Sequence, residues 1–116
     1  MATLTADQIL AADDMRLHGP VTVGEWGGDV YIRVMSVGER DSYERLWIGR
    51  KDTGIENFRA EYLARCLCDE GGRLLFTRSQ VAQLANKSGA VVSRLFDSAL
   101  RHNNMTEADV EELGKA

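Results

Sequence analysis

The spacing of hydrophobic residues divides this chain into one strand-like segment flanked by helix-like segments. Between residues 21 and 35, valine and isoleucine recur at every second position in two runs, separated by the glycine-rich stretch 24–28. Such alternation is typical of strands with one buried face, and glycines between two runs indicate a turn. The pattern therefore predicts a β-hairpin over residues 21–35. It must pack on other elements, because an isolated hairpin is marginal in water.

Elsewhere the hydrophobic residues recur with the period of an amphipathic helix. By residue number, the predicted helices span 6–13, 37–48, 56–68, 78–86, 88–102 and 107–113. Residue pairs typical of capping boxes mark three helix starts, namely Thr5 with Gln8, Ser36 with Glu39, and Thr77 with Gln80. Gly71 and Gly72 are expected to end the 56–68 helix. The sequence thus predicts an α+β fold, mostly α, with the N-terminal hairpin packed on a bundle of about five or six short helices.

The length and charge of the chain limit the domain organisation and the functions that it can have. A chain of 116 residues is expected to form a single domain over residues 1–116. Its net charge of -4 argues against a broad nucleic-acid-binding surface, which needs clustered positive charge. No stretch resembles a signal peptide or approaches the length of a membrane span, so we expect a cytoplasmic protein. Cys66 and Cys68 fall in one predicted helix, where they point in different directions and are expected to stay reduced.

Candidate catalytic and metal-binding residues are sparse. The two histidines, His18 and His102, are placed in a predicted loop and at a predicted helix end. No serine, cysteine or lysine has a recognisable nucleophile setting, and no group of side chains has metal-ligand spacing. We therefore expect no enzymatic activity and no cofactor.

One segment allows a different interpretation. Residues 79–96, SQVAQLANKSGAVVSRLF, resemble a helix-turn-helix, because a Leu-Ala pair is followed by a glycine and then by Val-Ser-Arg. The spacing after the glycine is shortened, and the second helix begins with Gly-Ala-Val-Val, which offers little to read a base. A small DNA-binding regulator is the alternative function. Two helices packed for structural reasons explain the same pattern.

The two tryptophans have different predicted roles. Trp47 lies on the apolar face of a predicted helix and is expected in the core. Trp26 lies in the glycine-rich turn, where it either contacts a partner or folds back to cover the hairpin.

The order of short motifs along the chain resembles the tail assembly chaperones of long-tailed phages and prophages. The motifs are VTVGEWGGDVYIR at 21–33, GERD at 38–41, NFRA at 57–60 with LCDEG at 67–71 and LFT at 75–77, RLF at 94–96 after Ser88, and NMTEADVEEL at 104–113. No single motif is specific, but the ordered set covers nearly the whole chain.

The resemblance implies a non-catalytic binding function. Such chaperones bind the long helical tape measure protein and keep it soluble during tail assembly. A frameshifted longer form often recruits the tail-tube protein. Self-association is expected, as are action in the host cytoplasm and absence from the mature virion. At the hairpin we expect Glu25, Trp26 and Arg33 to contact the client or a neighbouring protomer.

Overall fold

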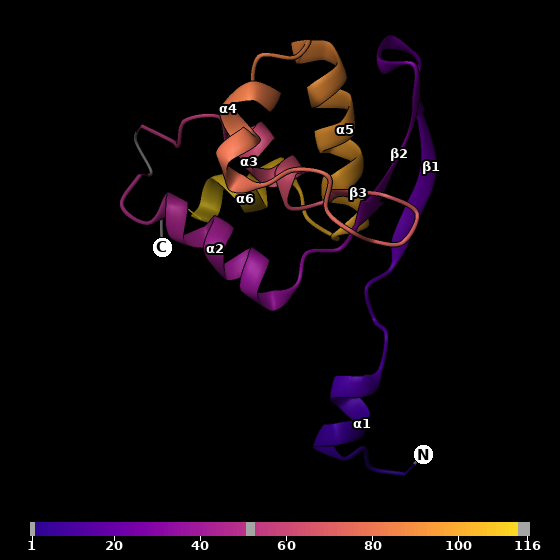
Figure 1. Cartoon of the computed structure of the whole chain (residues 1–116). Helices are drawn as coiled ribbons and strands as arrows, with labels where there is room; N and C mark the ends of the chain where they lie inside the picture. Colours follow the sequence, from indigo (N-terminus) through magenta and orange to yellow (C-terminus); the bar gives the residue numbers. More distant parts are fainter. Residues whose placement is uncertain (1, 51–52, 114–116) are drawn as a thin grey trace.

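Figure 1 shows a three-stranded sheet packed beside a group of short helices, with one helix standing apart near the N-terminus. This computed structural model describes residues 2–50 and 53–113. In chain order the elements are α1 (Ala6–Ala11), β1 (Leu17–Val23), the 3-10 turn η1 (Gly24–Trp26), β2 (Gly28–Arg33), α2 (Val37–Trp47), α3 (Phe58–Ala64), β3 (Leu67–Cys68), the 3-10 turn η2 (Arg78–Gln80), α4 (Val81–Leu84), α5 (Gly89–His102) and α6 (Glu107–Leu113). The predicted α+β class is confirmed.

The predicted hairpin consists of β1 and β2, which pair antiparallel. It starts at Leu17 instead of Val21, and its register shifts between His18 and Val21. Pro20 lies within that irregularity. Since proline has no amide hydrogen to give to a ladder, the shift lets pairing resume on both sides of it. β2 is the central strand of the sheet and β1 lies at one edge.

The helix predicted over residues 56–68 is wrong at both ends. α3 begins at Phe58, after Asn57 in the left-handed conformation with φ 58°, and it ends at Ala64. Residues Leu67–Cys68 instead form β3, which pairs with β2 at the opposite edge from β1. Periodicity could not reveal this change, because every residue from 62 to 68 is buried and such a run carries neither a helical nor a strand pattern.

The glycine pair at 71–72 therefore turns the chain out of a strand and does not end a helix. Leu74 forms a bridge to Cys68 on the return path. The side-chain oxygen Oδ1 of Asp69 accepts hydrogen bonds from two amides of this turn, at 2.9 and 3.0 Å. The helix predicted over 78–86 is also shorter, since η2 precedes an α4 of only 4 residues.

The core centres on three aromatic side chains contributed by α2, α3 and α5. Tyr62 packs edge-to-face with Tyr43, with ring centroids 5.1 Å apart, and with Phe96 at 5.3 Å. All three side chains are fully buried. Trp47 is buried as predicted. This aromatic column joins the three helices into one packed body.

The cysteines do not share a helix. Cys66 follows α3 and Cys68 lies in β3, yet both are buried and neither forms a disulfide. Burial raises the pKa of the Cys66 thiol to about 12. These residues therefore behave as the small apolar core residues that the sequence indicated.

The predicted capping boxes are all present. Their reciprocal bonds are formed by Thr5 with Gln8, Ser36 with Glu39, and Thr77 with Gln80. α1 nevertheless differs from the other capped helices, because none of its residues is buried. Local capping is thus enough to define where α1 starts but does not attach it to the core.

Candidate functional site

The hairpin tip is shaped by η1. Gly27 has the left-handed φ of 78°, and its amide donates to the carbonyl of Val23 at 3.1 Å. This tight turn directs Trp26 toward the helices, where its side chain is partly buried against the core. Trp26 therefore folds back to cover one end of the hairpin, as one of the two alternatives predicts, and keeps part of its surface accessible. Contact with a partner stays a prediction.

Trp26 forms one wall of a small hollow, here called the Trp26 hollow. The other lining residues are Phe76, Gln83, Leu84 and Lys87, and the volume is about 230 Å³. Its surface is almost entirely apolar. An open apolar hollow of this kind can accept a hydrophobic side chain from a partner.

Glu25, the residue before Trp26, ties the tip to α5. Its two carboxylate oxygens accept hydrogen bonds from both terminal nitrogens of Arg94, at 3.1 and 3.0 Å. The hydrogen bond from Arg94 is the main cause that lowers the pKa of Glu25. The pair is solvent-exposed and contributes little to overall stability, but its two-point geometry fixes the direction in which the tip leans.

Arg33 lies at the other end of β2 and is not brought to the hairpin tip. Its guanidinium donates to the Gly72 carbonyl at 2.8 Å and pairs with the carboxylate of Glu39. Glu39 also completes the capping box of α2 through Ser36. Arg33 thus connects β2, the 69–73 turn and the start of α2. Glu25 and Trp26 share one surface, and Arg33 belongs to another.

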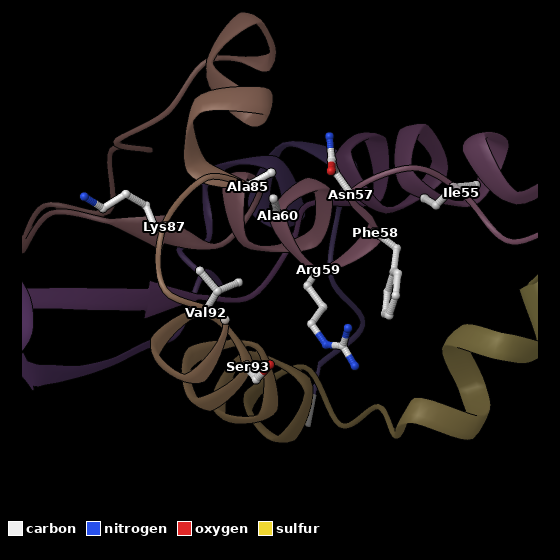
Figure 2. Close-up of a pocket in the computed structure, with 10 residues that line it drawn as sticks. Ile55, Asn57, Phe58, Arg59, Ala60, Ala85, Lys87, Val92 and Ser93 are labelled. Carbon is white, nitrogen blue, oxygen red and sulfur yellow. The ribbon is translucent and has the colours of Figure 1, made fainter.

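A second and larger hollow, here called the Phe58 groove, lies between α3 and α5 (Figure 2). Its volume is about 420 Å³. The side chains of Ile55, Phe58, Ala85 and Val92 supply its apolar surface, while Arg59 and Lys87 add positive charge. Lys87 also borders the Trp26 hollow, so the α4–α5 connection separates the two hollows.

Sequence reasoning missed most of these lining residues. Phe76 falls in the LFT motif at 75–77 and Lys87 in the helix-turn-helix-like segment, and neither was expected to line a site. Their association with Trp26 depends on β3, because this strand sets the path of the chain that leads to Phe76. No local pattern in the sequence marks that path.

The described residues offer little support for other kinds of site. Within residues 2–50 and 53–113, no group of three or more His, Cys, Asp or Glu side chains could hold a metal ion. In the same ranges, no helix has the length and apolar character needed to cross a membrane. In the helix-turn-helix-like segment, Arg94 already pairs with Glu25 instead of projecting freely from α5.

Comparisons with known proteins agree with this architecture. A family model described as phage tail assembly chaperone matches residues 6–115. The solved structure of the bacteriophage HK97 tail assembly chaperone superposes with a TM-score of 0.62, at 24% identity, over 86% of this chain and 94% of that one. A comparison with curated proteins gives no match.

Proposed function

Because the chain belongs to the phage tail assembly chaperone family, we propose that it binds a tape measure protein and keeps this client soluble while the tail assembles. Family membership gives the assembly role and implies that the protein is not a catalyst. The client, its binding surface and the site of action in the host cytoplasm are the parts that we propose. Recruitment of a tail-tube protein by a longer form stays a prediction.

The Trp26 hollow is the observation that supports a client-binding surface at the hairpin tip. It combines a rigid aromatic side chain with an open apolar cavity, which is the arrangement found at the energetic centre of protein interfaces. Leu75, the neighbour of Phe76 in the chain, is 46% exposed and adds apolar surface. A largely helical client would present hydrophobic residues at intervals of three or four positions and insert one of them here.

Glu25 and Arg33 support this surface in different ways. Glu25 holds the hairpin tip against α5 through Arg94, so its loss would loosen the wall formed by Trp26. Arg33 acts at a distance by fixing the far end of β2. Direct contact of either residue with the client stays a prediction.

The test is co-expression of this protein with the tape measure protein encoded in the same genome, followed by size-exclusion chromatography. We expect the long client to stay soluble and to co-elute with the chaperone. Trp26→Ala should reduce the co-eluting fraction, because it removes a wall of the hollow. Leu17→Ala is the matched control, since Leu17 is an exposed apolar residue of the same hairpin but does not line the hollow.

A second variant separates loss of binding from loss of folding. Gln83 is exposed at the Trp26 hollow, and Gln83→Glu would place a charge there without removing a core contact. If both Trp26→Ala and Gln83→Glu retain the client like the wild type, the hollow is not the binding surface. If the wild type itself leaves the client insoluble, the proposed client is wrong.

A further inference from the structure

α1 is a helix without a partner in its own chain. None of its residues is buried, and three apolar side chains in or beside it are largely exposed: Leu4 at 64%, Ile9 at 57% and Leu10 at 83%. A helix of 6 residues is too short to be stable in water by its capping box alone. Its apolar side chains therefore need a surface outside the segment itself.

The arm that carries α1, defined as residues 2–16, stands away from the body (Figure 1). The radius of gyration is 15.3 Å, against about 13 Å expected for a compact chain of this length. The arm leaves the body at Arg16, whose carbonyl oxygen lies 2.8 Å from Nε2 of His102 at the C-terminal end of α5. The arm is thus anchored at one end of α5 and projects from there.

The Phe58 groove lies toward the opposite end of α5, where Val92 contributes to its surface. From Val92 to His102 the helix rises by about 15 Å. Figure 2 shows Val92 and Ser93 facing the groove from α5, opposite the residues of α3. Within one copy, most of the length of α5 therefore separates the groove from the point where the arm leaves the body. The groove of a second copy is not held at this distance from the arm.

The charges of the arm and the groove are complementary. Residues 2–14 contain Asp7, Asp13 and Asp14 and neither lysine nor arginine. The groove carries Arg59 and Lys87. The guanidinium of Arg59 lies 4.5 Å above the Phe58 ring, and among the described residues its Nε has no hydrogen-bond partner. An acidic, apolar segment is the kind of ligand that this combination of rings and cations would bind.

From these observations we infer that the α1 arm of one copy docks into the Phe58 groove of a second copy, with Leu10 and its apolar neighbours inserted in the groove and aspartates facing Arg59 and Lys87. This contact goes beyond the proposed client binding and uses a different surface. It gives the expected self-association a defined donor segment and a defined acceptor.

The experiment measures the mass of the full-length protein by sedimentation as a function of concentration, with no client present. We expect the wild type to associate. Leu10→Glu should weaken association by about ten-fold or more, which is the effect of losing one buried leucine side chain. Val37→Glu is the matched control, because Val37 is 79% exposed but lies on α2, outside both the arm and the groove.

The acceptor side needs its own variant. Ser93→Glu places an acid in the groove, where it should repel the arm and weaken association to a similar degree. Ala82→Glu places the same side chain at an exposed residue of α4, outside the groove, and should leave the mass unchanged. Circular dichroism of each variant checks that the fold is kept.

Mixing the two defective variants distinguishes exchange between copies from docking within one copy. Leu10→Glu keeps an intact groove and Ser93→Glu keeps an intact arm, so an equimolar mixture should form pairs that neither variant forms alone. The inference is overturned if the wild type is monomeric, if Ser93→Glu associates normally, or if the mixture fails to pair. Because no client is used, these outcomes are independent of the tape measure experiment.

Discussion

At the level of single residues, this protein uses a few buried or half-buried polar side chains to join elements that are distant in sequence. Asn103 at the end of α5 accepts a hydrogen bond from the Met35 amide at 2.8 Å and donates one to the Ala99 carbonyl at 2.9 Å. Arg65 donates to the hydroxyl of Ser42 at 2.9 Å. Such bonds satisfy groups that would otherwise be costly to bury, and they fix the order in which helices meet.

Phe96 is one of the aromatic side chains that pack against two other rings in the core. It contacts Tyr62 and Phe58 edge-to-face and is itself fully buried. Phe96→Ala should lower the free energy of unfolding by about 3–5 kcal/mol, because it leaves a cavity among these rings. Urea denaturation measures the loss. Phe96→Leu, which retains most of the volume, should cost less, and equal losses for the two variants would contradict the cavity explanation.

The buried thiol of Cys66 predicts a loss of stability in alkaline solution. Its pKa is raised from 9.0 to about 12 by burial, and burial also raises the pKa values of Tyr43 and Tyr62. The folded chain keeps protons that the unfolded chain releases, so the stabilisation is complete below pH 9 and is lost as the pH rises from there.

Above pH 9 the Cys66 thiol should contribute a slope that approaches about 1.4 kcal/mol per pH unit. The two tyrosines add to this slope only above pH 10.0, where their hydroxyls ionise in the unfolded chain. Urea unfolding at a series of pH values between 8 and 11 tests this expectation. Between pH 9 and 10, the unfolding free energy of the Cys66→Ala variant should fall less steeply with pH than that of the wild type, whatever the stability of the variant at neutral pH. Parallel slopes would show that this thiol does not ionise differently in the two states.

At the level of elements, two helices have the same capping chemistry but different attachment to the core. α1 and α2 both start with a complete capping box, yet α1 buries nothing while α2 buries Tyr43 and Trp47. Loss of a cap lowers the free energy of global unfolding only if the capped helix unfolds together with the rest of the molecule.

This difference gives a matched pair of variants. Ser36→Ala should lower the unfolding free energy by about 1 kcal/mol, the usual effect of losing an N-cap side chain. Thr5→Ala should leave the unfolding midpoint of the monomer nearly unchanged, because α1 is not part of the core. Chemical denaturation at low protein concentration compares them, and equal effects would mean that α1 unfolds together with the body.

At the level of the whole molecule, the distribution of charge argues against the helix-turn-helix alternative. The net charge is -4, and the exposed Arg94 of α5 is held by Glu25. We expect no mobility shift of a DNA fragment even at low salt, where phosphate contacts are strongest. A basic helix-turn-helix protein serves as the positive control. A shift that weakens steeply with added salt would favour the alternative.

The sequence by itself determined the features that depend on short-range physics. The capping boxes, the hairpin and the helix over residues 88–102 were all predictable, because each depends on residues that are neighbours in the chain or one helical turn apart. The position of Trp26 at the hairpin tip was predictable for the same reason. The ordered motifs also indicated the family, which the match over residues 6–115 confirms.

The tertiary structure alone decided how buried segments are used and which side chains meet. Leu67–Cys68 is a strand because the open edge of β2 is available to pair with it, a long-range fact that no local pattern encodes. That pairing brings Phe76 to Trp26, while Arg33 is directed to Glu39 at the other end of the strand. Contacts between distant segments follow from the packing of the whole core, and sequence spacing carries no information about them.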